Sequence, residues 1–401
     1  MILGDSIMSF ELEKSKCDQA GQLLKELDID AWLVWVRETS QISDPVMELI
    51  FGGDVVWQSA FLFTKQGDKI SIAGNFDTDG IKAQGIFDEV IPYTQGIKEE
   101  LVRQLVKYDP SKIAINYSTN DVAADGLTVG MHMILKDYLK DTPYVDRLIS
   151  GEKLVQKLRG RKSAAEIERV KKAVAITEEI FKAAEGFVKL GMTEIEIYDL
   201  FHREMDKHGV TSAWNDDHNP AVDAGPNKQF GHAGPIENKT KSGHLLHFDF
   251  GVRYKGYCSD IQRMFFFGEE NDIPEQVQTA FETVRDGIIA SSEFIRPGVL
   301  GYEVDAVARD FVKAAGYEEY QHALGHQIGR HAHDGGGLLG PQWERYGDTV
   351  KQPVEVGNLF TLEFYVTTED YGQMSLEEDI VVTKNGCEFL SHPQKKLICI
   401  N

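Results

Sequence analysis

The segment HLLHFDFGVRYKGYCSDIQRMFFFG, from His244 to Gly268, places the strongest constraint on how this chain folds. Its apolar and aromatic residues predict the two strands of a β-hairpin that packs into a core. Asp249 and Asp260 nevertheless lie within these strands. Because aspartate is almost never fully buried unless it is paired or bound to a metal ion, both carboxylates require a partner.

We predict a turn at Tyr254-Lys255, which places Asp249 directly opposite Asp260 on one face of the hairpin. Opposed Cβ atoms lie roughly 4.5–5.5 Å apart. Two ionised carboxylates at that separation repel each other by about 4 kcal/mol at an effective dielectric constant near 20. Either one carboxyl is therefore protonated or a cation lies between the two.

A second hairpin repeats this arrangement. Residues Leu359–Val366 and Gln373–Thr383 predict strands around a turn at Glu369–Gly372, which places Glu363 opposite Glu377. Charged residues in a single hairpin usually lie on its solvent-exposed face. Two opposed carboxylate pairs, each flanked by Phe, Leu or Ile, favour metal binding instead. Carboxylates supplemented by imidazole suit two metal ions ~3.5–4 Å apart.

The candidate source of imidazole is the segment QHALGHQIGRHAHDGG, residues 321–336, which lies between the two hairpins. It carries four histidines, namely His322, His326, His331 and His333. Most individual histidines in a glycine-rich loop are not metal ligands. For His322 and His331, a solvated or hydrogen-bonded loop residue is at least as good an interpretation.

The length of 401 residues predicts two domains. In the first part, helical patterns over residues 10–27, 97–108 and 129–139 alternate with strand patterns over residues 31–36, 60–64, 69–74 and 112–117. This alternation predicts an α/β domain over residues 1–155, in which we find no catalytic constellation. The second domain, residues 156–401, carries both hairpins and the histidine segment.

Two capping boxes predict helices in the second domain. One helix begins at Ser163 with Glu166, and another begins at Thr193 with Glu196 and ends at Gly209. The sequence LGMTEIEIYDLFHREMDKHG (190–209) resembles PGVLGYEVDAVARDFVKAAG (297–316), with glycines aligned near both ends. A single repeat of this length indicates a duplicated half-domain, although two ordinary amphipathic helices would look similar.

Composition excludes some partners. The formal net charge of −22, from 42 Lys and Arg against 64 Asp and Glu, argues against nucleic acid, which requires a basic face. Four scattered cysteines without a CxxC pair predict neither a disulfide framework nor a thiolate metal site. The first residues lack the features of a signal peptide, and no apolar run approaches the ~18 residues of a membrane span. We therefore expect a cytoplasmic protein without a nucleic-acid or membrane partner.

The order of these motifs resembles that of one known family. Asp249 and Asp260, then H-x-x-x-H-x-x-G-x-x-x-H-D, then E and E-x-D are similar to the motifs of the metallopeptidases with the pita-bread fold. These include aminopeptidase P, prolidase (Xaa-Pro dipeptidase) and methionine aminopeptidase, and the resemblance covers residues 155–395. It implies an α+β catalytic domain made of pseudo-twofold duplicated halves. The N-terminal α/β domain resembles the companion domain of the proline-specific branch and of creatinase.

The resemblance implies that two divalent metal ions are bound by Asp249, Asp260, His326, Glu363 and Glu377. Asp260 and Glu377 would bridge the ions. Asp249 would bind one ion, and His326 and Glu363 would complete the shell of the other. A hydroxide held between the ions would be the nucleophile, and Glu363 would handle its proton. The family favours manganese, and cobalt, zinc and iron also fit oxygen and nitrogen ligands.

The resemblance also implies cleavage of the peptide bond before proline. His232 would hydrogen-bond the substrate near the scissile amide, and His333 would contact the carbonyl on the proline side. His322 would shape the pocket. The family often forms homodimers, which we expect here.

Two departures from the family pattern bear on the substrate. The family commonly has E-P-G where this chain has Glu363-Phe364-Tyr365, and an arginine where this chain has Ser375. Arg330, at an unusual position, is our candidate to replace that arginine and bind the free carboxylate of a dipeptide. We therefore favour an Xaa-Pro dipeptidase. The alternatives are an Xaa-Pro aminopeptidase acting on longer peptides, a creatinase-like C–N hydrolase that uses no metal, and a binding module. The complete set of potential ligands disfavours the last two.

Overall fold

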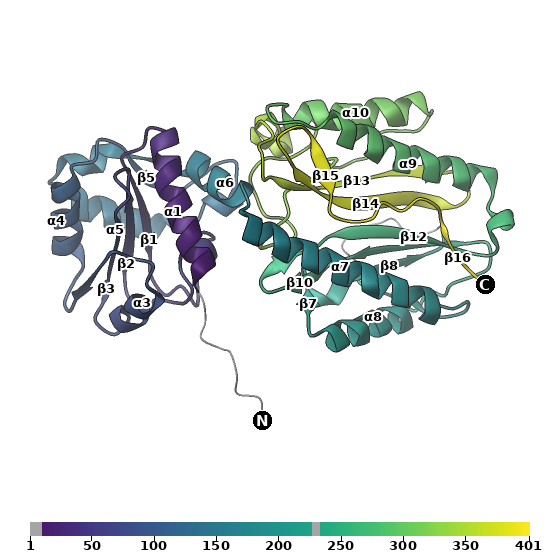
Figure 1. The fold of residues 1–401 in the computed structure, drawn as a ribbon, viewed down its shortest axis with the longest axis horizontal. Helices are drawn as coiled ribbons and strands as arrows, with labels where there is room; N and C mark the ends of the chain where they lie inside the picture. The colour runs from purple at the N-terminus through teal and green to yellow at the C-terminus, as the bar shows by residue number, and fades with distance from the viewer. Residues whose placement is uncertain (1–9, 227–232) are drawn as a thin grey trace. The chain divides into compact units, whose positions relative to one another are not determined.

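The structure is a computed structural model that describes residues 10–226 and 233–401. It contains two compact units, of which the first ends at Arg159 and the second begins at Gly160 (Figure 1). The first unit is built on a six-stranded sheet with the order β4-β3-β2-β1-β5-β6. Its strands are β1 (Ala31–Val36), β2 (Ser59–Thr64), β3 (Lys69–Gly74), β4 (Glu89–Tyr93), β5 (Ile113–Ile115) and β6 (Leu148–Ser150). Its helices are α1 (Glu11–Glu26), α2 (Met47–Ile50), α3 (Thr78–Gln84), α4 (Lys98–Tyr108), α5 (Val129–Leu139) and α6 (Glu152–Gly160).

Both faces of this sheet are buried, which explains why β1 reads AWLVWV without polar alternation. Trp32 and Val34 belong to one apolar cluster, whereas Leu33 and Trp35 belong to another. Successive side chains of a strand point to opposite faces, so helices are needed on both sides of the sheet. The expected alternation of helices and strands is confirmed in this unit.

The second unit contains a seven-stranded sheet in which β13, β14, β12, β9 and β8 are successive neighbours, with β15 on β14 and β16 on β12. These strands are β8 (Ala221–Ala224), β9 (Leu245–Phe250), β12 (Ile261–Phe267), β13 (Leu359–Thr368), β14 (Gly372–Val382), β15 (Cys387–Phe389) and β16 (Ile398–Ile400). A smaller sheet contains β7 (Thr211–Ser212), β10 (Val252–Tyr254) and β11 (Tyr257–Cys258).

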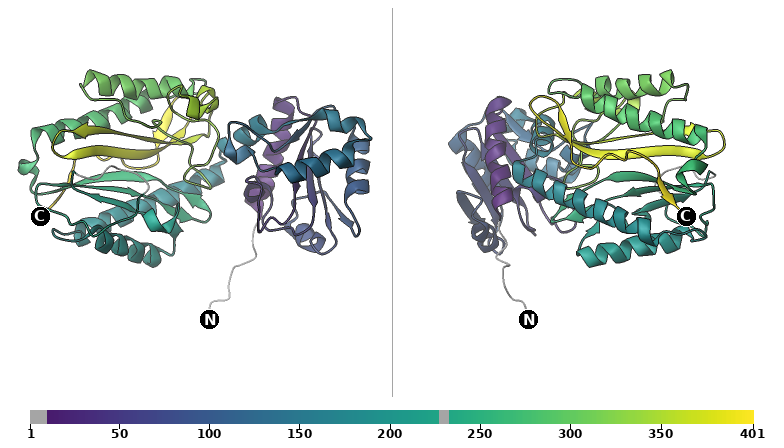
Figure 2. Two further views of the ribbon diagram at one scale, coloured as in Figure 1. Left: turned by 180° about the vertical axis from the view of Figure 1, so that it is seen from behind. Right: turned by 45° about the vertical axis from the view of Figure 1, so that its right-hand side comes forward.

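Four long helices flank these strands, namely α7 (Ala164–Phe187), α8 (Glu194–His208), α9 (Glu275–Phe294) and α10 (Gly301–Ala314). Figure 1 shows α9 and α10 beside β13 and β14, whereas α7 and α8 lie beside β8 and β10 on the other side of the strands. The two views in Figure 2 show the same arrangement. Phe281 of α9 and Val304 of α10 pack with Phe360 and Phe364 of β13 in one buried core.

The two helix–strand halves repeat each other. Gly191 and Gly298 precede α8 and α10 with φ of 85° and 96°, and Gly209 and Gly316 follow them with φ of 63° and 85°. Positive φ favours glycine, so the aligned glycines of the sequence mark the same backbone turn in both halves. The expected duplicated half-domains are confirmed.

The predicted helix starts are also confirmed. Ser163 and Glu166 form a capping box at the start of α7, and Thr193 and Glu196 form one at the start of α8. Each box satisfies two backbone N–H groups that a helix start leaves without an intrahelical partner. Over the residues that the structure describes, we find no helix long and apolar enough to cross a membrane.

The register of the first carboxylate hairpin differs from the prediction. Asp249 lies opposite Gln262 and not opposite Asp260. The turn is Lys255-Gly256, one residue later than predicted, and its residues have φ of 48° and 79°. A two-residue hairpin turn of this type requires positive φ at both central positions, and glycine adopts it readily. Moving the turn by one residue moves the register by two.

Asp260 lies at a break in the hairpin, between β11 and β12. A Cβ on Gly251 would lie 1.9 Å from Ser259 O, so only glycine permits the close approach of the two chains at this point. The register makes Asp260 a diagonal neighbour of Asp249 on the same face. The second hairpin is as predicted, with Glu363 directly opposite Glu377.

Candidate metal centre

Four carboxylates from neighbouring strands point to one face of the large sheet. Glu363 of β13 lies opposite Glu377 of β14. Glu377 in turn lies opposite Gln262 of β12, and Gln262 lies opposite Asp249 of β9. Opposed residues project from the same face of a sheet, and Asp260 reaches this face from the start of β12. The sheet therefore gathers carboxylates that are far apart in the sequence.

His326 lies in an extended segment that runs along β13. Thr361 N–H donates to His326 O at 3.0 Å, and Glu363 N–H donates to Leu324 O at 2.7 Å. Gly325 permits this approach, because a Cβ there would lie 1.9 Å from Thr361 O. The backbone pairing thus fixes the position of the imidazole relative to Glu363.

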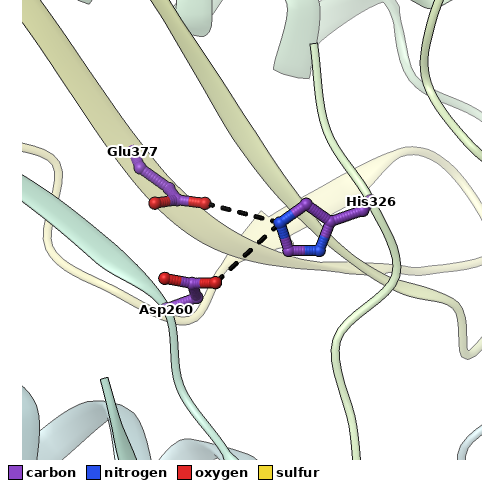
Figure 3. A group of neighbouring side chains, drawn as sticks. All are labelled: Asp260, His326 and Glu377. Carbon is purple, nitrogen blue, oxygen red and sulfur yellow. Dashed lines mark ion pairs between the residues drawn. The ribbon is translucent and has the colours of Figure 1, made fainter. Parts of the chain in front are cut away.

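The imidazole of His326 faces three carboxylates. Its Nε2 lies 3.6 Å from Glu363 Oε1, 3.8 Å from Asp260 Oδ2 and 3.9 Å from Glu377 Oε1. Figure 3 shows Glu377, from β14, and Asp260, the residue just before β12, pointing toward the ring. Ligand atoms of these two carboxylates and His326 lie within 4.8 Å of one another, which is compatible with binding of a common metal ion.

Burial changes the protonation of these groups. Loss of solvation and the Asp249 carboxylate raise the pKa of Asp260 well above its usual range, and they raise the pKa of Glu363 to about 8. Burial and then the Asp260 carboxylate raise the pKa of Glu377. Burial, and then the nearby His333, holds the pKa of His326 well below its usual range. Without a cation, Asp260, Glu363 and Glu377 therefore retain their protons to higher pH than ordinary carboxyls do, and the His326 imidazole is neutral.

The buried acceptor atoms fit divalent metal ions. Asp260 Oδ1 and both carboxylate oxygens of Glu377 have no hydrogen-bond partner within the described residues, and each such buried atom costs about 1–3 kcal/mol. His326 Nδ1 lies 3.4 Å from Gln327 O, which favours the ring proton on Nδ1 and leaves the Nε2 lone pair facing the carboxylates. Hard cations are the natural complement of such a set of oxygen and nitrogen acceptors.

A cavity of about 440 Å³ lies beside the carboxylates. Its lining residues are Ala213, Trp214, His218, Ala221, Asp249, Arg253, Asp260, His331, Ala332 and His333. The volume falls within the ~300–1,000 Å³ of typical small-molecule sites. The His333 ring is centred 4.2 Å from the His326 ring, so His333 reaches both the cavity and the carboxylate cluster.

The structure does not place Arg330 or His322 in the cavity wall. The Arg330 guanidinium lies over the ring of Tyr257, 4.8 Å from its centroid. The His322 ring packs 5.5 Å from that of Tyr365, and its Nδ1 lies 2.7 Å from Ala323 O. Both side chains are therefore engaged by neighbouring aromatic or backbone groups. His232 lies outside the described residues.

Two residues of the site were not predicted from the sequence. Arg253 lines the cavity and donates to Arg330 O at 2.5 Å and to Ala213 O at 3.1 Å. It follows Asp249 by four residues, so a period of two along the hairpin places it on the same face. Asp379 is fully buried and accepts a hydrogen bond from Asp260 N–H at 3.1 Å. In the sequence, Asp379 is the aspartate of the E-x-D motif that begins at Glu377, so this motif could have identified it.

A helix–strand unit used twice around one acidic face is the architecture of the pita-bread metallopeptidases. Residues 168–384 match metallopeptidase family M24, so the chain belongs to this family and is a metallopeptidase. The family, fold and enzyme class expected from the motifs are thereby confirmed.

The most similar proteins include relatives that match over nearly the whole chain. An uncharacterized peptidase of Bacillus subtilis, YqhT, is 27% identical over 389 residues, which cover 96% of this chain and 100% of that protein. The Xaa-Pro dipeptidase from Bacillus anthracis is 25% identical, with a TM-score of 0.74 and coverage of 97% of this chain and 100% of that chain. The X-Pro aminopeptidase from Thermotoga maritima MSB8 is also 25% identical, with a TM-score of 0.71 and coverage of 96% and 99%.

Proposed function

We propose that this metallopeptidase hydrolyses the peptide bond preceding proline and uses two divalent metal ions. The observation that carries the proposal is the approach of His326 Nε2 to three carboxylates at 3.6–3.9 Å. In this proposal the two most buried carboxylates, Asp260 and Glu377, would hold both ions. Asp249 would hold one of them, and His326 and Glu363 would hold the other.

When bound by these residues, divalent ions would polarise the scissile carbonyl and would lower the pKa of water toward neutrality. The side chains of the protein then manage protons and orientation. Glu363 receives the proton of the attacking water and passes it to the leaving nitrogen. His333, at the edge of the cavity, donates a hydrogen bond to the carbonyl on the proline side and so holds the substrate in place. His232 is proposed to act on the other side of the scissile bond.

The preference for substrate length follows from the chemistry of proline. The bond before proline is a tertiary amide whose nitrogen has no hydrogen to donate, so recognition depends on ring shape and on the carbonyl or carboxylate that follows. A dipeptidase requires a cation for the free carboxylate. Arg253 is the cation in the cavity wall, and we propose it for this role in place of Arg330. We therefore favour Xaa-Pro dipeptides as substrates.

An Xaa-Pro aminopeptidase acting on longer peptides is the second candidate. The observation in its favour is that an X-Pro aminopeptidase and an Xaa-Pro dipeptidase are equally similar to this chain, at 25% identity. The two activities differ in what lies beyond the proline, where an aminopeptidase must leave the site open.

Turnover of matched peptides tests the function and the length preference together. With manganese added, we expect Xaa-Pro dipeptides to have kcat/KM at least about tenfold above that of Xaa-Pro-Yaa tripeptides, because a charge-assisted hydrogen bond contributes ~1.5–3 kcal/mol. Release of proline, or of Pro-Yaa, is measured by chromatography. Faster cleavage of tripeptides would assign an aminopeptidase. Cleavage of neither substrate would contradict the proposed function.

Two arginine variants provide the control. Arg253→Ala should lower dipeptide kcat/KM about tenfold or more and leave tripeptide kcat/KM nearly unchanged. Arg330→Ala removes a guanidinium that stacks on Tyr257 outside the cavity wall, so its effect on the two substrates should be equal. A selective loss with Arg330→Ala instead would restore the original assignment of the carboxylate to Arg330.

The proposal includes three further features that rest on the family resemblance and the sequence. Manganese is the expected working metal, although cobalt, zinc and iron fit the same ligand types. The expected assembly is a homodimer. The expected location is the cytoplasm, in keeping with four cysteines that are all free thiols.

A further inference from the structure

A line of buried polar side chains crosses the large sheet toward Glu363. Asp223 of β8, His247 of β9 and Gln262 of β12 lie on adjacent strands and are 2%, 3% and 6% exposed. Asp223 Oδ2 lies 2.9 Å from His247 Nδ1, and His247 Nε2 lies 3.0 Å from Gln262 Oε1. Gln262 Nε2 then donates to Glu363 Oε2 at 3.0 Å. The line therefore connects four strands by hydrogen bonds.

Ser375 indicates the direction of these hydrogen bonds. Its hydroxyl lies 2.6 Å from Gln262 Oε1 and 3.2 Å from Phe364 O, and it donates along the shorter contact, to Gln262. The amide oxygen of Gln262 thus accepts from Ser375 and from His247, and its NH₂ group is left to donate to Glu363. For Gln262 Oε1 to accept from His247, the ring must carry a proton on Nε2, and its Nδ1 faces the Asp223 carboxylate, which is an acceptor. Ser375 stands where the family usually has arginine, so this departure belongs to the same network.

The network restricts how the Glu363 carboxylate is turned. The Gln262 amide donates to Glu363 Oε2, and this leaves Glu363 Oε1 facing His326 Nε2 at 3.6 Å. A glutamate side chain that is not held in this way samples several rotations of its carboxylate. Residues that hydrogen-bond to a metal ligand orient that ligand, and removing them typically lowers metal affinity or activity 10–100-fold.

Stability alone does not account for these residues. The strand neighbours Leu246, Phe248 and Met264 are buried apolar side chains, and the three polar residues occupy the same sheet. Replacing a buried polar or ionic group by an apolar side chain of similar volume is often neutral or stabilising. Three polar residues in one connected line that ends at Glu363 thus indicate a role at the site.

We propose that Asp223, His247 and Gln262 are positioning residues that hold Glu363 in its working orientation. The proposal rests on the role of Glu363 in the proposed function. Asp223 fixes the orientation of the His247 ring, His247 fixes the amide of Gln262, and the amide fixes the carboxylate.

The first experiment removes the last member of the line. Gln262→Met keeps the volume and removes the amide, and we expect kcat to fall 10–100-fold with KM changed less than about threefold, together with 10–100-fold weaker Mn²⁺ binding by calorimetry. The matched control is Gln394→Met. Gln394 is also buried against β12, where it bonds the backbone of Met264 at 3.0 and 2.7 Å. Its loss should leave kcat and Mn²⁺ affinity near those of the unmodified protein.

The second experiment acts at the far end of the line. In Asp223→Asn the new amide donates to His247 Nδ1 and so keeps the ring proton on Nε2, toward Gln262. This variant should retain kcat and Mn²⁺ affinity within about threefold. Asp223→Leu removes the constraint and should lower both about tenfold. Thermal unfolding of each variant reports any general loss of stability separately.

Equal behaviour of Asp223→Asn and Asp223→Leu, with both near the unmodified protein, would overturn the proposal. An equal effect of Gln262→Met and Gln394→Met would overturn it as well. The calorimetric measurement of Mn²⁺ binding needs no substrate. If no Xaa-Pro peptide is cleaved, the proposed function fails while the binding data still decide whether the line positions Glu363.

Discussion

Asp260→Asn and Glu377→Gln are each expected to abolish peptide hydrolysis. These carboxylates are the two most buried of the cluster and face the same imidazole nitrogen, at 3.8 and 3.9 Å. A residue that bridges two ions cannot be replaced by an amide without losing charge and coordination at both. The loss of kcat should therefore exceed the ~100-fold loss that is typical when a residue hydrogen-bonded to a metal ligand is replaced. Steady-state assays with saturating manganese measure it.

The same two substitutions should be neutral or stabilising in the chelated protein, because they remove a buried carboxyl from a crowded acidic cluster. Glu388→Gln is a suitable control, since Glu388 is an exposed carboxylate on β15. It should leave kcat unchanged. Near-normal turnover of either Asp260→Asn or Glu377→Gln would show that the bridging assignment is wrong.

The chelated protein should lose stability as the pH rises from 6.5 to 8. Burial raises the pKa of Glu363 to about 8, and the pKa values of Asp260 and Glu377 are also raised. A carboxyl with a higher pKa in the folded chain holds its proton there while the unfolded chain has already released it. The free energy of unfolding therefore falls with pH, by about 2 kcal/mol over this window for Glu363, and the other two carboxyls act in the same direction. Urea unfolding at a series of pH values measures the slope.

Other buried groups act differently in this window. Burial raises the pKa of Asp44 in the first unit to about 6, so most of its effect lies at lower pH. Burial also raises the pKa of Asp379 well above its usual range, which adds to the fall, whereas burial lowers the pKa of His322 to about 4, which opposes the fall slightly near pH 6.5. Glu363→Gln should reduce the slope of the free energy of unfolding against pH by the contribution of one carboxyl. Saturating Mn²⁺ should remove the share of the slope that comes from the metal ligands, because metal binding requires deprotonated ligands. A chelated protein whose stability is constant or rises between pH 6.5 and 8 would contradict this account.

Local signals in the sequence were sufficient for much of the fold. The capping boxes at Ser163 and Thr193 are confirmed, because the interactions that start a helix lie within four residues. The register of β13 and β14 is also as predicted, with Glu363 opposite Glu377. The first hairpin was placed wrongly, since the position of the turn depended on which residue pair adopts positive φ. Gly256 is the residue that decides it.

Long-range packing limited the prediction of the site. The sequence favours Arg330 as a carboxylate-binding residue because it lies among the histidines, and this role stays a prediction; its guanidinium packs on Tyr257, a contact that no local pattern indicates. Arg253 lies on the cavity instead. His247 is a single histidine within an apolar strand, which usually indicates a core residue. Its connection to Asp223 and Gln262 depends on the order of strands β8, β9 and β12, which no local pattern contains.

The number of metal ions in the active protein tests the central claim most directly. The chelated chain is titrated with Mn²⁺, and activity on an Xaa-Pro dipeptide is compared with the bound metal determined by elemental analysis. Our account predicts that activity appears only with bound metal and reaches its plateau at two ions per chain. A fully active protein without bound transition metal would contradict it and favour a creatinase-like reaction, and a plateau at one ion would contradict the two-ion site.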